Sequence, residues 1–280
     1  MGLKAILKQV TPPVILSLAK KFYYRYSSTG YGLTGNYSSW EQAVAESSGY
    51  DAQSILEKTK LALLKVKDQQ AVYERDSVLF DEVDYSWSLL AGLMWVAARH
   101  GGKLNVLDFG GSLGSTYYQN RKFLAALSQV RWNIVEQLHY VETGKACFED
   151  NSLRFYPTIP ACLSESRPDI ILLSGVLQYL KSPYSILKQV MEIPADLILI
   201  DRTPFWSGKE DRVFIQRVPP EIYAASYPIW VFSMERFFSI FQDEWKVLTM
   251  FDNPTDRLNG PIDFSFQGIF IVREERMSTQ

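Results

Sequence analysis

The chain has 280 residues, a length that is long for one domain and short for two, and 47% of them are hydrophobic, enough for a sizeable core. Its 29 basic and 31 acidic residues give a net charge of −2, which excludes a strongly basic nucleic-acid-binding protein and an acidic disordered chain. Two cysteines, Cys147 and Cys162, are too few for a disulfide framework, so we expect a cytoplasmic protein.

The first 40 residues form a basic arm that contains no acidic residue. Its cations are Lys4, Lys8, Lys20, Lys21 and Arg25. Its longest apolar stretch is too short to span a bilayer and follows Pro12 and Pro13, so we expect neither a membrane span nor an export signal. The arm either packs on the domain or makes weak contact, through residues 1–26, with anionic lipid at the inner face of the membrane.

Helical patterns dominate the segment that follows the arm. Apolar residues recur at helical spacing, and Ser38 or Ser39 can cap the first helix. The expected elements are a short helix from Trp40, an amphipathic helix over 52–70, an irregular acid-rich segment over 73–84 and a buried helix over 86–102. We therefore predict a basic arm and helical extension over residues 1–83, followed by a larger domain over 84–280.

From Leu104 onward, short apolar runs alternate with helical stretches. Continuous apolar strands separated by helices indicate a parallel sheet that is covered on both faces. The predicted strands are 105–109, 131–136, 153–157, 169–175, 195–201, 245–251 and 263–273, and the predicted helices are 115–129, 139–149, 182–193 and 233–243. Because no helix separates the last two strands, we expect the sheet to end in an antiparallel pair.

A glycine-rich turn follows the first of these strands, in the sequence VLDFGGSLGS. Gly110, Gly111 and Gly114 let the backbone approach a ligand closely, and the following helix start offers free N–H groups. The carboxylate of Asp108 would repel a pyrophosphate, but it suits a ligand that carries an ammonium and a sulfonium. Glu136, at the end of the second strand, can accept hydrogen bonds from two ribose hydroxyls. The pattern thus favours S-adenosylmethionine over a dinucleotide.

These residues resemble the class I S-adenosylmethionine-dependent methyltransferases. Residues 106–114 fit the first motif of that family, Glu136 fits the acid that ends its second strand, and residues 169–180 fit its fourth-strand segment. More narrowly, the chain is similar to an uncharacterised bacterial methyltransferase-like family that occurs with surface-polysaccharide genes, through residues 35–43, 73–81, 107–121, 132–137 and 176–180. The resemblance implies a Rossmann-like α/β fold with a seven-stranded, mostly parallel sheet, an antiparallel last strand, and S-adenosyl-L-methionine as cofactor.

We expect the functional residues at the carboxyl ends of the strands. The expected cofactor contacts are Asp108, Gly110, Gly111, Ser112, Gly114, Glu136, Gln137 and Ser174, together with Tyr73 and Arg75. Residues 73–76 (Tyr73, Glu74, Arg75 and Asp76) either close over the cofactor or form a polar surface turn. Asp201 is the best-placed base by topology, and His139 is the next candidate. Tyr179 and Gln178 can orient the acceptor, and Arg202 can hold a phosphate on it. One carboxylate near the fourth and fifth strand ends is too few for Mg²⁺, so we expect no metal.

The expected activity is O-methylation of a sugar or glycan precursor, nucleotide-linked or lipid-linked, in polysaccharide biosynthesis. Residues 174–177 read SGVL where amino-directed nucleic-acid methyltransferases carry Asp/Asn-Pro-Pro-aromatic, so we expect no nucleic-acid partner. Two alternatives stay open, an NAD(P)-binding oxidoreductase on a related sheet and a non-catalytic binding module that keeps the methyltransferase fold.

Overall fold

The structure, a computed structural model, describes residues 32–49, 52–218, 225–241, 244–253, 256 and 258–273. Residues 1–31 of the predicted basic arm, which include the proposed lipid contact over residues 1–26, lie outside the described residues. Within them, no helix combines the length and the apolar character needed to cross a membrane.

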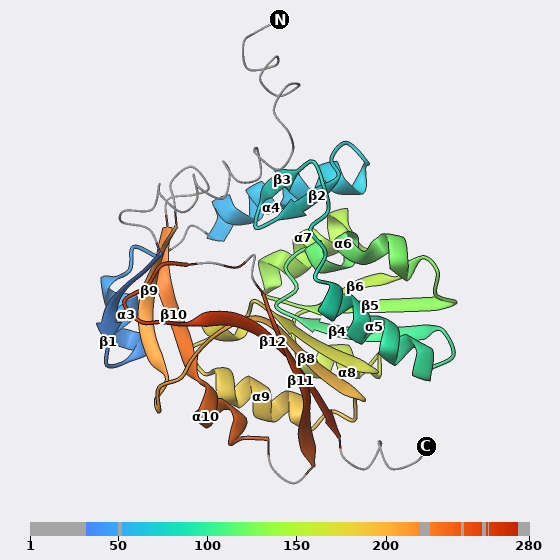
Figure 1. The fold of residues 1–280 in the computed structure, drawn as a ribbon. Helices are drawn as coiled ribbons and strands as arrows, with labels where there is room; N and C mark the ends of the chain where they lie inside the picture. Colours follow the sequence, from blue (N-terminus) through green and yellow to red (C-terminus); the bar gives the residue numbers. More distant parts are fainter. Residues whose placement is uncertain are drawn as a thin grey trace, which may run out of the picture.

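Seven strands form the central sheet (Figure 1). Their spatial order is β6 (Leu153–Tyr156), β5 (Gln129–Val135), β4 (Lys103–Phe109), β7 (Ile170–Ser174), β8 (Leu197–Trp206), β12 (Ser265–Arg273) and β11 (Trp245–Asp252). The strands from β6 to β8 are parallel, whereas β12 runs antiparallel to both of its neighbours. The predicted Rossmann-like α/β fold, with its antiparallel last strand, is therefore confirmed.

Helices cover both faces of this sheet because alternate side chains of each strand point to opposite sides. In β8, Leu197 and Leu199 enter one hydrophobic core, whereas Ile198 and Ile200 enter the other. The first core is covered by α4 (Ala52–Lys67), α5 (Trp87–Arg99), α6 (Ser115–Leu124) and α7 (Leu138–Cys147). The second is covered by α8 (Ile159–Leu163), α9 (Pro183–Met191) and α10 (Met234–Phe238). Because both faces of these strands are buried in apolar cores, polar site residues lie at the strand ends.

Three strands that we did not predict extend the sheet beyond β8, so ten strands are joined in the described part of the chain instead of seven. They are β10 (Ala225–Ser233), which pairs with the end of β8, then β9 (Arg212–Val218) and β1 (Gly32–Tyr37). The extension exists because β8 continues to Trp206, past the predicted strand end at Asp201. Helix α3 (Trp40–Glu46), capped by Ser39 as predicted, packs Trp40 against Trp230 of β10, with ring centroids 5.7 Å apart.

The acid-rich segment over 73–84, predicted to be irregular, contains a β-hairpin. Its strands are β2 (Tyr73–Arg75) and β3 (Val78–Phe80). The two residues between them, Asp76 and Ser77, have φ values of 52° and 68°. Positive φ at both positions is typical of the two-residue turns that suit a hairpin, and Asp is common at the first position, but the second normally carries Gly and here carries Ser77. The sequence therefore lacked the usual hairpin signal.

Candidate functional site

The glycine-rich loop turns the chain from β4 into α6 at the carboxyl edge of the sheet. Gly110 and Gly114 have φ values of 74° and 104°, and Ser112, with φ of 54°, shares this left-handed conformation. The Gly110 N–H donates to the carbonyl of Val135 on β5, at 2.9 Å. A Cβ at position 110 would lie 2.3 Å from Cγ2 of Val176, so a larger residue there would displace its neighbour as well as strain the backbone.

Asp108 lies directly beneath this loop, at the end of β4. Its side chain is 1% exposed, and a Cβ at Gly111 would lie 2.4 Å from its Oδ2. The indole N–H of Trp132 donates to Oδ2 at 2.9 Å, whereas Oδ1 is buried and receives no hydrogen bond within the described residues. Burial, together with the nearby Glu136 carboxylate, raises the pKa of Asp108 to about 7. A buried carboxylate oxygen without a donor is costly, and a cationic or N–H-bearing ligand would relieve that cost.

Glu136 stands on the other side of the loop, just after β5. Burial raises the pKa of this half-buried side chain, while the backbone N–H groups of Gln137 and Ser112 oppose the rise. The Gln137 N–H donates to Glu136 Oε2 at 2.7 Å, and the Gln137 side chain is exposed at the start of α7. Two acidic residues from neighbouring strands thus face one glycine loop, and a positively charged ligand is their natural complement.

The β2–β3 hairpin is anchored on α6, the helix that follows the loop. Glu74 is 2% exposed, and its Oε2 accepts a hydrogen bond from Ser115 Oγ at 2.7 Å. Its Oε1 accepts one from the N–H of Ser77 at 2.8 Å. The hydroxyl oxygen of Tyr73 accepts a bond from Gln119 Nε2 at 3.1 Å. The hairpin therefore lies beside the glycine loop, and Glu74, which we had not singled out as an anchor, holds it there.

Asp201, the expected base, lies opposite Ser174 in the register of β7 and β8. It is 1% exposed, and burial raises its pKa. Its Oδ1 accepts a hydrogen bond from Asn253 Nδ2 at 2.9 Å, and its Oδ2 accepts one from Ser174 Oγ at 3.3 Å. Each oxygen keeps a further lone pair, so Asp201 can take a proton from an acceptor that reaches this buried position. Asn253 is a partner that no sequence motif indicated.

The other two candidate catalytic residues point elsewhere. Tyr179, on the short 3₁₀ helix η1 (Leu177–Tyr179), donates its hydroxyl to Gln216 Oε1 at 2.9 Å and contacts the ring of Tyr227, both on the sheet extension. His139 lies in the first turn of α7, after β5, and its Nε2 is buried without a hydrogen bond in the described part of the chain. Because β5 and β8 are three strands apart, roughly 14 Å, the structure does not bring His139 to Asp201.

Arg202 does not present a free guanidinium to a phosphate, as we had expected. Its Nη2 lies 2.9 Å from Asp76 Oδ2, and its Nε lies 3.1 Å from Asp256 Oδ2. Two carboxylates already compensate its charge, so a phosphate would have to displace one of them. No group of three or more His, Cys, Asp or Glu side chains among the described residues is arranged to hold a metal ion.

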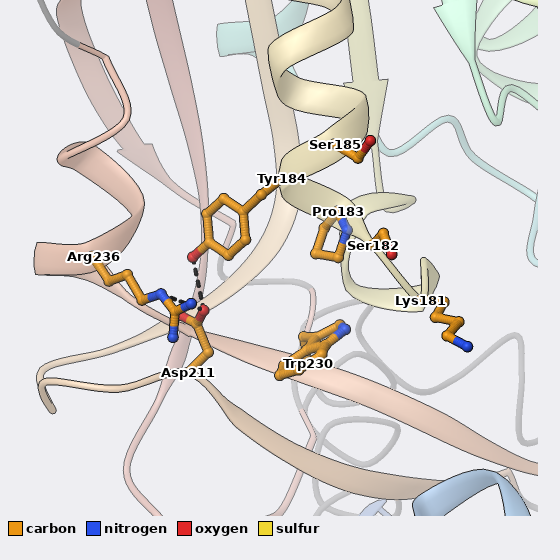
Figure 2. Close-up of a pocket in the computed structure, with 8 residues that line it drawn as sticks. All are labelled: Lys181, Ser182, Pro183, Tyr184, Ser185, Asp211, Trp230 and Arg236. Carbon is orange, nitrogen blue, oxygen red and sulfur yellow. Dashed lines mark hydrogen bonds and ion pairs between the residues drawn. The ribbon is translucent and has the colours of Figure 1, made fainter. Parts of the chain in front are cut away.

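A separate cavity of about 250 Å³ opens at the start of α9 (Figure 2). Its lining residues are Lys181, Ser182, Pro183, Tyr184, Ser185, Asp211, Trp230 and Arg236. Asp211 accepts a hydrogen bond from the Tyr184 hydroxyl at 2.8 Å and pairs with Arg236 at 3.4 Å, and Lys181 pairs with Glu41. These charges are satisfied within the protein, and none of the expected site residues lines the cavity. The glycine loop therefore remains the candidate site.

Comparisons with models of protein families and with curated protein sequences give no match. Among solved structures, the chain is similar to the N-terminal domain of EvdMO1 in the presence of SAH and D-fucose, with 14% identity over 80% of this chain and 97% of that chain and a TM-score of 0.45. It is also similar to the Burkholderia thailandensis 1,6-didemethyltoxoflavin-N1-methyltransferase, with 13% identity, coverage of 89% and 97%, and a TM-score of 0.42. A third is magnesium protoporphyrin IX methyltransferase (ChlM) from Synechocystis, with 10% identity, coverage of 67% and 79%, and a TM-score of 0.41. Because the sequence identities and the TM-scores are this low, the function has to be argued from the site itself.

Proposed function

We propose that the protein is an S-adenosylmethionine-dependent methyltransferase. The observation that carries this proposal is the pair of acids, Asp108 and Glu136, around one glycine loop at the carboxyl ends of β4 and β5. Burial raises the pKa of both groups, although His139 opposes the rise at Glu136, so the loop is flanked by carboxyls that a positively charged ligand would stabilise. A ligand with a sulfonium and an ammonium supplies that charge, whereas a pyrophosphate adds repulsion.

The residues present fit this cofactor. The unpartnered Oδ1 of Asp108 needs a donor, and Glu136 has oxygens for two ribose hydroxyls. Gly110, Gly111, Ser112 and Gly114 supply the backbone of the cradle, and Gln137, Ser174, Tyr73 and Arg75 complete the proposed contacts. When bound, S-adenosyl-L-methionine supplies an electrophilic methyl group. The anchored hairpin would exclude water from the site, which strengthens the electrostatic interactions within it.

The proposed acceptor is the hydroxyl of a sugar or glycan precursor, methylated without a metal ion. Gln178 is 2% exposed and donates through Nε2 to the carbonyl of Arg202 at 3.1 Å, which leaves its buried Oε1 without a donor in the described structure. That oxygen can accept a hydrogen bond from an acceptor hydroxyl at the ends of β7 and β8. Asp201 would take the hydroxyl proton at Oδ2. We further propose a role in polysaccharide biosynthesis, on the resemblance alone, and a cytoplasmic location, on the low number of cysteines.

The experiment that tests the cofactor site compares two matched variants by calorimetric titration with S-adenosylhomocysteine. Glu136→Gln removes a carboxylate that faces the loop, and Glu142→Gln removes an exposed one from the same region, on α7. We expect Glu136→Gln to weaken binding by about 1–3 kcal/mol and Glu142→Gln to bind like the parent. Equal affinity in all three proteins would place the site elsewhere. Binding without transfer to any of a panel of sugars would favour a non-catalytic binding module.

A further inference from the structure

Four charged side chains from three separate segments form a ring of alternating charge across the carboxyl edge of the sheet, closed by Arg75 Nε, which lies 3.7 Å from Asp76 Oδ2. Asp76, in the hairpin turn, pairs with Arg202 of β8 at 2.9 Å. Arg202 also pairs with Asp256 at 3.1 Å, and Asp256 pairs in turn with Arg75 of β2. We call Arg75, Asp76, Arg202 and Asp256 the ionic latch.

The latch crosses the place where the cofactor and the acceptor would meet. The hairpin is anchored on α6, which follows β4, whereas Arg202 belongs to β8. Strand β7 lies between β4 and β8, so the link from Asp76 to Arg202 passes over the end of β7 and beside the glycine loop. A Cβ at Gly175, just after β7, would lie 3.8 Å from Cβ and Nη1 of Arg202. Figure 1 shows β2 and β3 beside α4 and α6, above this edge.

Backbone strain is concentrated at the same place. Five non-glycine residues in the described chain have a positive φ, and three of them are Asp76, Ser77 and Arg202. A fourth is Ser112, in the glycine loop. Such conformations are costly for residues with a Cβ, and they cluster at ligand clamps and at segments that switch between two states. Strain therefore falls on both members of the Asp76–Arg202 pair and on the glycine loop.

The two carboxylates of the ionic latch, Asp76 and Asp256, differ in how exposed they are to solvent. Asp256 and Asp76 each lie between the guanidinium groups of Arg75 and Arg202, but the Asp256 side chain is 10% exposed and that of Asp76 is 61% exposed. Arg75 has a further carboxylate nearby, that of Asp84 at 3.6 Å. Exposed ion pairs are weak and are screened by salt. The hairpin is thus held by a shielded pair, between Arg75 and Asp256, and by an exposed pair, between Asp76 and Arg202, and the exposed pair opens most easily.

We propose that the ionic latch gates the cofactor site, so that the hairpin must separate from Arg202 before a cofactor or its product enters or leaves. This gate rests on the proposed function, since the glycine loop is what it covers. Because the closed latch opposes passage in both directions, weakening it raises the association and dissociation rates together. The equilibrium affinity then changes less than either rate. Salt acts in the same direction as a mutation, because it screens the same exposed pair.

The test measures binding rates of S-adenosylhomocysteine to the full chain by stopped flow at 0.05 and 0.5 M NaCl, on the parent and two variants. Asp76→Asn removes the exposed carboxylate of the latch, and Asp81→Asn makes the same charge change at an exposed residue just after the hairpin. We expect Asp76→Asn to raise both rates about two- to fivefold and to lose most of their salt dependence. We expect Asp81→Asn to behave like the parent. Equal rates and equal salt dependence in the two variants would overturn the gate.

Hydrogen exchange of the segment 73–80 separates failure of the gate from failure of the proposed function. In the parent, S-adenosylhomocysteine should slow exchange there, and Asp76→Asn should speed it in the free protein, while Asp81→Asn should not. Normal binding with unchanged exchange in Asp76→Asn would overturn the gate alone. No binding of S-adenosylhomocysteine to the parent would overturn the proposed function, and the gate with it.

Discussion

Replacing Asp108 with asparagine removes the buried carboxyl group that lies beneath the glycine loop of the candidate site. Its pKa is about 7 in the folded protein, against an ordinary value of 3.8. As the pH rises from about 4 to about 7, the unfolded chain loses this proton while the folded chain keeps it. The stability of the parent therefore falls over this range, and the loss is complete above pH 7.

The size of the effect follows from the two pKa values. A difference of about three in pKa corresponds to about 4 kcal/mol, and the 1% exposure of Asp108 leaves little solvent to reduce it. Asp108→Asn has no charge to bury, and its amide oxygen can keep the bond from Trp132. Relative to the parent, the variant should gain up to about 4 kcal/mol in unfolding free energy between pH 4 and pH 8.

The pH dependence of ligand binding gives a second measurement of the same carboxyl group. S-adenosylhomocysteine lacks the sulfonium but keeps the ammonium group, which the ionised form of Asp108 binds best, so the affinity of the parent for this ligand should rise with pH through about 7. Asp108→Asn should bind more weakly and without this pH dependence. Urea unfolding measures the stability and calorimetry measures the affinity, each at pH 5, 6, 7 and 8. If the unfolding free energies of parent and variant change with pH in the same way, the raised pKa assigned to this buried carboxyl group is refuted.

Three further substitutions test other parts of the structure. Asp201→Asn should leave the affinity for S-adenosylhomocysteine intact and lower turnover at least about a hundredfold with a working acceptor, whereas unchanged turnover would move the base elsewhere. Gly144→Ala places a Cβ 2.4 Å from the buried ring of Phe155, so denaturant unfolding should show a loss of about 1–3 kcal/mol; a gain, as helix propensity alone predicts, would contradict this packing. Trp40→Leu should cost about 1 kcal/mol through the lost stack on Trp230, and an unchanged melting temperature would argue against that contact.

The central sheet could be predicted because its signals are local. The runs 170–173 and 197–200, within the predicted strands 169–175 and 195–201, are continuously apolar, as is typical of strands covered on both faces. Their ends differ from the prediction by a few residues, except in β8. The helix predicted over 115–129 ends at Leu124, because the chain must turn before β5 begins at Gln129.

The sheet extension could not be predicted in the same way. Strand β1 pairs Gly32 with Arg217, far along the chain, and its sequence GLTGNY contains two glycines and an asparagine. Such residues weaken a strand unless tertiary pairing compensates. Pairing of this kind depends on the whole fold, and no pattern within the segment reveals it. The division of the chain at residue 84 stays a prediction.

The cofactor side of the site was easier to foresee than its catalytic side. Asp108 and Glu136 end neighbouring parallel strands, and the topology alone therefore brings them to one loop. Asp201 also stands where the topology places it, but its partners Ser174 and Asn253 depend on side-chain directions and on β11, which sequence spacing does not show. The roles of these residues stay predictions.

The central claim is that the glycine loop binds a cationic nucleoside cofactor and not a dinucleotide. Calorimetric titration of the parent protein with S-adenosylhomocysteine and, separately, with NADH tests this claim most directly. We predict saturable binding of S-adenosylhomocysteine that weakens in Glu136→Gln, and no binding of NADH. Binding of NADH without binding of S-adenosylhomocysteine would contradict the account and assign the loop to a dinucleotide.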